Sequence, residues 1–237
     1  MKKLVVIVAL LASTALTVMA QSAEEILDKS IQARGGAEKL NSLKSLRMEG
    51  TVSVMGMEIP TKSVIMHRRG MRNEMEAMGQ SIIMAIDGEK GWMINPMAGP
   101  EPTPLPEEQL KASVSQLDLS GITNYKSSGT KTELLGKETL DGTEVYKVKM
   151  VSKDGMSMTH SIDTKNFNII RTAIKVNVSG QDVEVETKMS NYKVFDGISF
   201  PTTTEINNPQ AGVIMTTITK VEINPTIDES VFVMPKK

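Results

Sequence analysis

The feature that most constrains the fold is an alternation of apolar and polar residues that returns along most of this chain. In residues 46–54, every second side chain is apolar apart from one glycine. Because successive side chains of a β-strand point to opposite faces, this pattern predicts a strand with one apolar and one solvated face. The same alternation returns in residues 145–150, 156–162, 169–178, 183–189 and 213–223. Strands therefore dominate the predicted structure.

Turn-forming dipeptides separate these alternating runs. They are Asp87-Gly88, Asp141-Gly142, Asp154-Gly155, Asp196-Gly197, Ser179-Gly180 and Asn207-Asn208. Asp-Gly between two such runs is a strong hairpin signal, because both residues tolerate the positive φ of tight primed turns. We therefore expect successive strands to be antiparallel neighbours, in a mainly β domain of about ten or eleven strands built as a sandwich or barrel.

Residues 22–43 depart from the strand pattern and predict helices. Ser22 can cap a first helix, Glu25 is its capping-box partner three residues later, and Gly35-Gly36 ends it. Ala37 to Leu43 can add a short second helix. The chain is thus expected to place a small helical element before its sheet.

The segment around residues 97–118 is the second departure. Five prolines lie between positions 96 and 106, and a helix is predicted from Pro106 with Leu110, Val114 and Leu117 on one face. A long connection of this kind within a sheet is a common place for a lid or a binding loop. A helix that simply plugs one end of a barrel is an equally good interpretation.

The first 20 residues predict an export signal. Lys2 and Lys3 precede an apolar run, and Ala20 supplies the small residue needed for cleavage. The run is shorter than the ~20 residues that a membrane-spanning helix requires. We therefore expect residues 1–20 to be removed and residues 21–237 to form one domain in the periplasm. The chain has no cysteine, so neither a disulfide nor a cysteine-linked lipid is expected.

Composition and spacing argue against several classes of function. With 27 basic and 28 acidic residues, charge gives no reason to expect binding to nucleic acid. His67 and His160 lie in alternating runs without metal-ligand spacing, so no metal site is predicted. Glu74 and Glu76 could form the acid pair of a hydrolase, but Arg72 shares their face and ion pairing explains them. We therefore predict neither an enzyme nor a cofactor.

Methionine is the unusual residue type. Ten of the 18 methionines lie between positions 48 and 97, in a chain with one tryptophan. A flexible thioether fills irregular gaps in a core, and it equally suits a surface that accepts apolar ligands of variable shape. Residues 82–86 form a run that is apolar on both strand faces and should be covered on both. In a single sheet, the second cover would be a helix, a lid or a ligand.

Taken in order, these elements resemble a known family. Residues 65–98, IMHRRGMRNEMEAMGQSIIMAIDGEKGWMINPMA, combine a strand that ends in basic residues, a buried strand, Asp-Gly, a strand with a tryptophan and a proline-led loop. Residues 221–235, VEINPTIDESVFVMP, supply a last strand, an acidic turn and a final Phe-x-x-Pro. This order is similar to that of the LolA/LolB-like outer-membrane lipoprotein-sorting family.

The resemblance implies an unclosed, strongly curved antiparallel β-barrel whose mouth is covered by helices. Its apolar interior would hold the acyl chains of a lipoprotein or another lipid. The family arginine that ties the helical lid shut would correspond to Arg68, or to Arg69, which stands where a proline usually follows. Trp92 would line or roof the cavity, although an ordinary core position fits it as well. The expected lining is Val52, Val54, Ile65, Met75, Ile83, Met84, Trp92, Met93, Leu110 and Val114.

The resemblance also implies a role and partners. The expected protein is a monomeric periplasmic carrier that moves lipid towards the outer membrane, between an inner-membrane donor and an outer-membrane acceptor. A sensor or interaction module with the same fold and a filled interior is the alternative.

Overall fold

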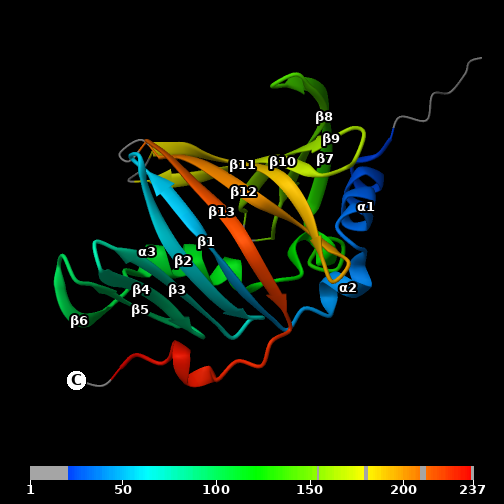
Figure 1. Ribbon diagram of the computed structural model, residues 1–237. Coiled ribbons are helices and arrows are strands. Elements are labelled where there is room, and N and C mark those ends of the chain that lie inside the picture. Colours follow the sequence, from blue (N-terminus) through cyan, green and yellow to red (C-terminus); the bar gives the residue numbers. More distant parts are fainter. Residues whose placement is uncertain (1–20, 154, 179–180, 209–211, 236–237) are drawn as a thin grey trace, which may run out of the picture.

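The structure, a computed structural model, describes residues 21–153, 155–178, 181–208 and 212–235. The predicted export signal at residues 1–20 lies outside this part of the chain. One strongly curved antiparallel sheet forms most of the molecule, and short helices lie inside its curve (Figure 1). None of the helices in the described ranges is both long and apolar enough to cross a membrane.

The sheet contains 13 strands in the order β6-β5-β4-β3-β2-β1-β13-β12-β11-β10-β9-β8-β7. The outermost strands, β6 and β7, do not pair with each other. The barrel is therefore unclosed, as the family resemblance implied. The bounds are β1 Ser45–Val54, β2 Met57–Met66, β3 Gly70–Ala77, β4 Gln80–Asp87, β5 Lys90–Asn95, β6 Gly99–Pro104, β7 Lys131–Leu140, β8 Thr143–Val151, β9 Ser157–Asp163, β10 Ile169–Val178, β11 Gln181–Phe195, β12 Ile198–Asn208 and β13 Gly212–Ile223.

The proline-rich segment supplies a strand that the sequence did not predict. Strand β6 has a proline at every second position from Pro100 to Pro104. Proline cannot donate a backbone hydrogen bond, so a sheet tolerates it chiefly on an edge strand. Strand β6 is such an edge and pairs only with β5. The same composition that suggested a loop is therefore compatible with a strand at this position.

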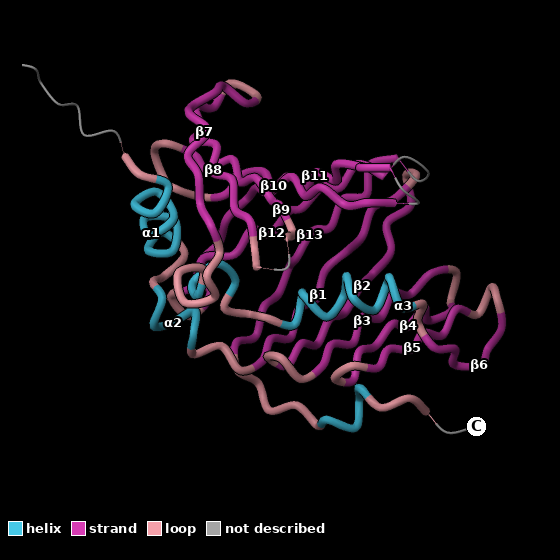
Figure 2. Tube along the Cα trace, turned by 180° about the vertical axis from the view of Figure 1, so that it is seen from behind, coloured by secondary structure: helices cyan, strands magenta, loops and turns pink. Residues whose placement is uncertain are grey.

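Helices divide the concave side of the sheet in two. Helices α1 (Ala23–Ala33) and α2 (Ala37–Asn41) lie beside the half that contains β7 to β9 (Figure 1). Helix α3 (Glu107–Val114), continued by the 3-10 helix η1 (Ser115–Leu117), crosses the other half (Figure 2). A further 3-10 helix, η2 (Gly121–Asn124), packs against α1 and α2. The capping box at the start of α1 is present as predicted.

Two separate hydrophobic cores follow from this division. The first core joins α1 and α2 to β8 and β9 and contains residues with no exposed surface, among them Ile26, Leu27, Leu40, Val148 and Ile162. The second core joins the segment around α3 to β2, β3 and β4, and its buried members are Ile65, Met71, Ile86, Leu105 and Leu117. The first core is much the larger of the two.

The hairpin turns collect at two opposite ends of the strands. The end that carries the turns at residues 55–56, 78–79 and 96–98 is termed the distal end, and it forms the left edge in Figure 1. The opposite, proximal end carries the turns at residues 67–69, 88–89, 141–142 and 196–197. Helix α2 and the end of β13 also lie at the proximal end.

Two of the distal turns were missed because methionine occupies a position that usually takes Asn or Asp. Met55-Gly56 has φ values of 51° and 79°, and Met78-Gly79 has 53° and 73°, as in a type I′ turn. The predicted turns Asp141-Gly142 and Asp196-Gly197 have the same signs at the proximal end. A non-glycine side chain in this left-handed region costs about 1–2 kcal/mol, least for Asn and Asp.

Candidate functional site

The pairing register shows which side chains share the concave face. Ile65 pairs with Met71, and Met71 pairs with Ile86, so these three lie on one face of the sheet. Ile86 pairs in turn with Gly91 of β5. The Cδ1 atom of Leu110 in α3 lies 3.0 Å from the place where a Cβ atom of Gly91 would lie. The face that carries Ile86 is therefore the one that α3 covers.

Apolar side chains on this face are buried near the proximal end and accessible near the distal end. In β2, Ile65 is 8 % exposed, whereas Met57 at the distal end is 48 % exposed. Met71 and Ile86 are almost fully buried, but the distal residues of the same strands are only partly buried. The accessible apolar residues of the distal concave face are Val52, Val54, Met57, Ile59, Met75, Ile82, Ile206 and Ile214.

A groove opens at the distal end of this face. It has a volume of about 560 Å³ and runs between the ends of β2, β3 and β4 and the β5–β6 turn. Its apolar lining includes Met57, Ile59, Ala77, Met78, Ile82 and Met97. The groove is thus continuous with the accessible part of the concave face, because Ile59 and Ile82 belong to both.

The segment that covers the middle of the face is anchored by leucines. Leu105 before α3 is 7 % exposed, and Leu117 after it is 3 % exposed. Leu105 and Leu110 both approach Gly91 so closely that a side chain at that position would collide with them. Val114, one turn beyond Leu110, is 38 % exposed. The helix therefore rests on the sheet mainly through its two flanks and one central leucine.

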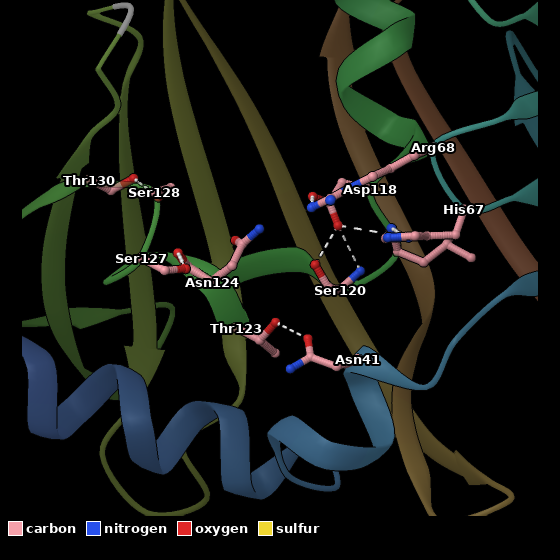
Figure 3. Close-up of polar contacts among 11 residues, drawn as sticks. Asn41, His67, Arg68, Asp118, Ser120, Thr123, Asn124, Ser127, Ser128 and Thr130 are labelled. Atoms are coloured by element: carbon pink, nitrogen blue, oxygen red, sulfur yellow. Dashed lines mark hydrogen bonds and ion pairs between the residues drawn. The ribbon is translucent and has the colours of Figure 1, made fainter.

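Arg68 connects this segment to the turn between β2 and β3. Its guanidinium donates to Oδ2 of Asp118 over 2.9 Å, directly after η1, and its backbone N–H donates to the Leu117 carbonyl over 2.9 Å. Figure 3 shows Arg68 and Asp118 facing each other across this contact. Arg68 has a positive φ of 54° in this turn. The contact joins the two elements that a lid latch would have to join.

Asp118 is the centre of a small polar network at this contact. Its carboxylate also accepts hydrogen bonds from the backbone and hydroxyl of Ser120, and His67 lies beside it (Figure 3). The Nδ1 atom of His67 accepts a hydrogen bond from the Leu119 N–H over 3.1 Å. Partial burial raises the pKa of Asp118, but the hydrogen bonds from Ser120 and Arg68 outweigh it and leave this pKa below its ordinary value.

Arg69 has different partners. Its guanidinium donates to Asp87 at the end of β4 and to Glu229 in the C-terminal segment, over 2.8 Å in the second case. Both partners lie outside residues 97–118. The structure therefore contradicts the expectation that Arg69 could latch the segment, since its side chain ties the C-terminal segment to the sheet.

Several residues predicted to line a cavity do lie on or over the concave face. Val52, Val54, Met75, Met84, Met93 and Leu110 share this side by register or by contact with it. Ile65 lies on the same side but inside the second core, so it contributes to the floor of the covered region. Met84 and Met93 pair with each other and pack against that core.

Ile83 and Trp92 are corrections to the predicted lining. Ile83 pairs with Glu74 and Ile94, and Trp92 pairs with Ala85, which places them on the convex face, opposite Met84 and Met93. Adjacent residues of a strand point to opposite faces, so Met84 and Ile83 could not both line one cavity. The run 82–86 is apolar on both sides because two different elements cover it.

The element that covers Trp92 is the C-terminal segment with its 3-10 helix η3 (Glu229–Phe232). The indole Nε1 donates to the Phe232 carbonyl over 2.7 Å, and Trp92 is 2 % exposed. The ring of Phe232 lies directly against Gly70, where no larger side chain would fit. Trp92 is thus a core residue under the C-terminal segment, the ordinary alternative that the sequence left open.

Glu74 and His160, two of the groups considered for catalysis, are engaged in structural contacts. Arg72 donates to Glu74 over 2.6 Å on the convex face, as expected for ion pairing. His160 is 5 % exposed, and its Nδ1 lies 2.9 Å from Oγ1 of Thr172. Burial, and secondarily the charge of Arg34, lowers the pKa of His160 to about 4, so the ring is neutral. Among the described residues, no group of His, Cys, Asp or Glu could hold a metal ion.

Comparison with known proteins gives structural matches only. No family model matches the sequence, and no curated protein matches it. A LolA superfamily protein from Nitrosomonas europaea superposes with a TM-score of 0.59 at 13 % identity, covering 90 % of this chain and 98 % of that one. A DUF1329 family protein from Desulfovibrio piger gives 0.60 at 12 % identity, with the same coverage.

A domain from Vibrio parahaemolyticus, described as an outer membrane lipoprotein-sorting protein, gives a TM-score of 0.54 at 12 % identity. It covers 88 % of this chain and 94 % of that one. Identities this low establish the architecture alone. The curved, unclosed sheet with helices on its concave side identifies this chain as a protein of the LolA-like fold.

Proposed function

We propose that this protein is a periplasmic carrier that binds the acyl chains of a lipoprotein or another lipid on the distal part of its concave face. The observation that carries the proposal is the change in burial along that face, from Ile65 at 8 % exposed to Met57 at 48 %. Contiguous accessible apolar surface of this kind commonly marks a binding site. Export to the periplasm rests on the predicted signal at residues 1–20.

The energetics suit a ligand that must be both held and released. Each methylene transferred from water to the apolar face contributes roughly 0.8 kcal/mol, so acyl chains need few specific contacts. Methionines such as Met57, Met75 and Met84 can adapt to chains of different shape. The exposed Arg68–Asp118 pair contributes only about 0–1 kcal/mol, so the segment over the face would open readily.

The similar structures support lipid or lipoprotein as the cargo class, because one of them is described as a lipoprotein-sorting domain. An inner-membrane donor and an outer-membrane acceptor are part of the same proposal. The proposed role is binding and not catalysis, and of the two acidic residues considered for hydrolysis, Glu74 is ion-paired with Arg72.

Two adjacent isoleucines offer a matched test. Ile82 lies on the concave face and lines the distal groove, whereas Ile83 lies on the convex face, and both are partly buried. We expect Ile82→Gln to weaken acyl binding and Ile83→Gln to leave it unchanged, at comparable losses of stability. The measurement is the shift in Tm on adding palmitate or a lipopeptide.

Mass spectrometry of lipids that copurify with the exported protein would identify the cargo. A protein that carries no lipid, and whose Tm does not respond to any acyl ligand, would contradict the carrier and support the interaction module. Equal loss of binding in both isoleucine variants would place the ligand elsewhere.

A further inference from the structure

The three successive hairpins β1–β2, β3–β4 and β5–β6 each carry an exposed methionine at their distal turn. Met55 is 77 % exposed, Met78 is 89 % exposed and Met97 is 84 % exposed. Met57, next to the first turn, is 48 % exposed. These four residues are termed the methionine rim. A single exposed apolar side chain is ordinary, but several gathered at one end of a molecule form the kind of patch that marks an interaction site.

The folding of the chain does not explain these methionines. Met55 and Met78 occupy the left-handed position of a type I′ turn, where Asn or Asp is favoured. The glycines that follow them face open space, with no atom near the place of a Cβ atom. The same turn type at the proximal end uses Asp141 and Asp196. The distal end therefore departs both from turn preference and from the expected polarity of an exposed turn.

The rim has the geometry of a row. Its hairpins are consecutive in the sheet order, so neighbouring turns are separated by two strands, or about 10 Å. Figure 1 shows the turns side by side along the left edge of the molecule. A row of projecting turns can touch a flat surface at several points at once, whereas a protein partner would need a matching set of recesses.

The rim also leads directly into the proposed binding site. Met57, Met78 and Met97 line the groove of about 560 Å³, together with Ile59 and Ile82 of the concave face. An apolar chain that left a surface in contact with the rim would enter the groove without crossing water. This continuity indicates that the surface in contact with the rim is apolar, like the proposed cargo.

The methionine rim has no basic side chains that could hold it against an anionic surface. In residues 53–60, 76–82 and 94–100 the charged side chains are Glu58 and Glu76, both acidic. Surfaces that bind anionic lipid headgroups by charge carry clusters of Lys and Arg instead. The rim would therefore insert by its apolar groups alone, with little dependence on salt or on anionic lipid.

We propose that the methionine rim inserts into the interfacial layer of a lipid bilayer and seats the open end of the concave face on the membrane. The inference rests on the proposed carrier function and adds the surface from which, or to which, acyl chains pass. Unbranched thioether side chains suit insertion among mobile lipid chains.

The test measures how much of the full exported chain floats with phosphatidylcholine vesicles, at low and at high salt. It compares wild type with a triple variant that carries Met55→Asn, Met78→Asn and Met97→Asn. We expect wild type to bind in both salts and the variant to lose roughly tenfold or more in partitioning. Its Tm should be unchanged or higher, because Asn is the better residue at two of the turns. Val194→Thr, which alters a side chain 69 % exposed outside the rim, is the matched control and should bind like wild type.

Binding of a soluble acyl ligand such as palmitate separates this inference from the proposed function. A wild-type protein that binds palmitate but not vesicles would overturn the rim proposal and leave the carrier intact. Binding that requires phosphatidylglycerol and disappears in salt would also overturn it. So would a wild-type dimer that the triple variant abolishes, because the rim would then be a contact between two copies. A wild-type protein that does not bind palmitate would instead contradict the proposed carrier function.

Discussion

The two halves of the concave face are covered in different ways. Under α1 and α2, the first core contains many residues with no exposed surface, and it extends across several strands. Under α3, the second core has five buried residues, two of which lie on the flanks of the helix. One sheet thus carries a tightly packed half and a lightly covered half. The difference teaches that tight packing and an accessible apolar surface can be assigned to separate regions of a single sheet.

The largest effect is expected where a core leucine of the packed half is truncated. Leu27→Ala removes a fully buried side chain from α1 and should lower the free energy of unfolding by about 2–5 kcal/mol. Leu110→Ala in α3 should lower it by less than half of that, because Leu110 is only partly buried. Urea unfolding would measure both. Equal losses would show that the two halves are covered equally firmly.

Acid should destabilise the packed half through His160. Burial holds the pKa of this ring at about 4, below its ordinary value of 6.5, so the unfolded chain binds a proton that the folded chain does not. Stability should therefore fall by roughly 3 kcal/mol as the pH is lowered from 6.5 to 4. His160→Gln should remove most of this slope in urea unfolding measured across that range. A variant with the wild-type slope would assign it to other groups.

Trp92 tests which side of the sheet faces the ligand. Trp92→Phe leaves the Phe232 carbonyl without its donor and should cost about 1–3 kcal/mol, with acyl binding unchanged. In wild type, acyl chains that carry bromine should leave the fluorescence of the indole unquenched, since the ring is on the convex face. Strong quenching would move Trp92 into the binding site and contradict its place under the C-terminal segment.

The smallest effect on stability is expected at the contact between Arg68 and Asp118. Asp118→Asn should lower the free energy of unfolding by about 1 kcal/mol or less, because the pair is exposed. If the pair holds the segment closed, the rate of acyl exchange should rise by up to about fivefold. Since the pKa of Asp118 is depressed, wild type should behave like the variant only once the pH falls low enough to protonate this carboxylate.

Arg69→Gln is the matched control for that measurement. Its side chain pairs with Asp87 and Glu229, so it should affect the C-terminal segment and leave acyl exchange unchanged. Faster exchange in Arg69→Gln, with no change in Asp118→Asn, would reverse the assignment of the two arginines.

The sequence was sufficient for the features that local chemistry decides. The capping box at Ser22 and Glu25, and the hairpins at Asp141-Gly142 and Asp196-Gly197, were predicted from a few adjacent residues and are present. Each depends on hydrogen bonds or φ angles within a single turn. Asn207-Asn208, predicted as a turn, belongs instead to strand β12, where neighbour pairing decides the structure.

The candidate site was predicted only in part, for a physical reason. A run such as residues 82–86 is apolar on both faces, so its periodicity cannot say which face meets a helix and which meets the C-terminal segment. The methionine rim was missed for a different reason, because Met55 and Met78 occupy turn positions that methionine seldom takes. Exposure of a methionine is a property of the folded surface, and no local pattern reports it.

The sequence by itself determined a mainly β chain of antiparallel hairpins, because an alternation of period two and the turn residues act over short distances. Only the tertiary structure decided that the sheet stays open, which arginine contacts the segment at residues 97–118, and that Trp92 lies on the far side from Met93. These outcomes depend on residues far apart in the chain, such as Trp92 and Phe232, and their contacts exist only after the sheet has curved.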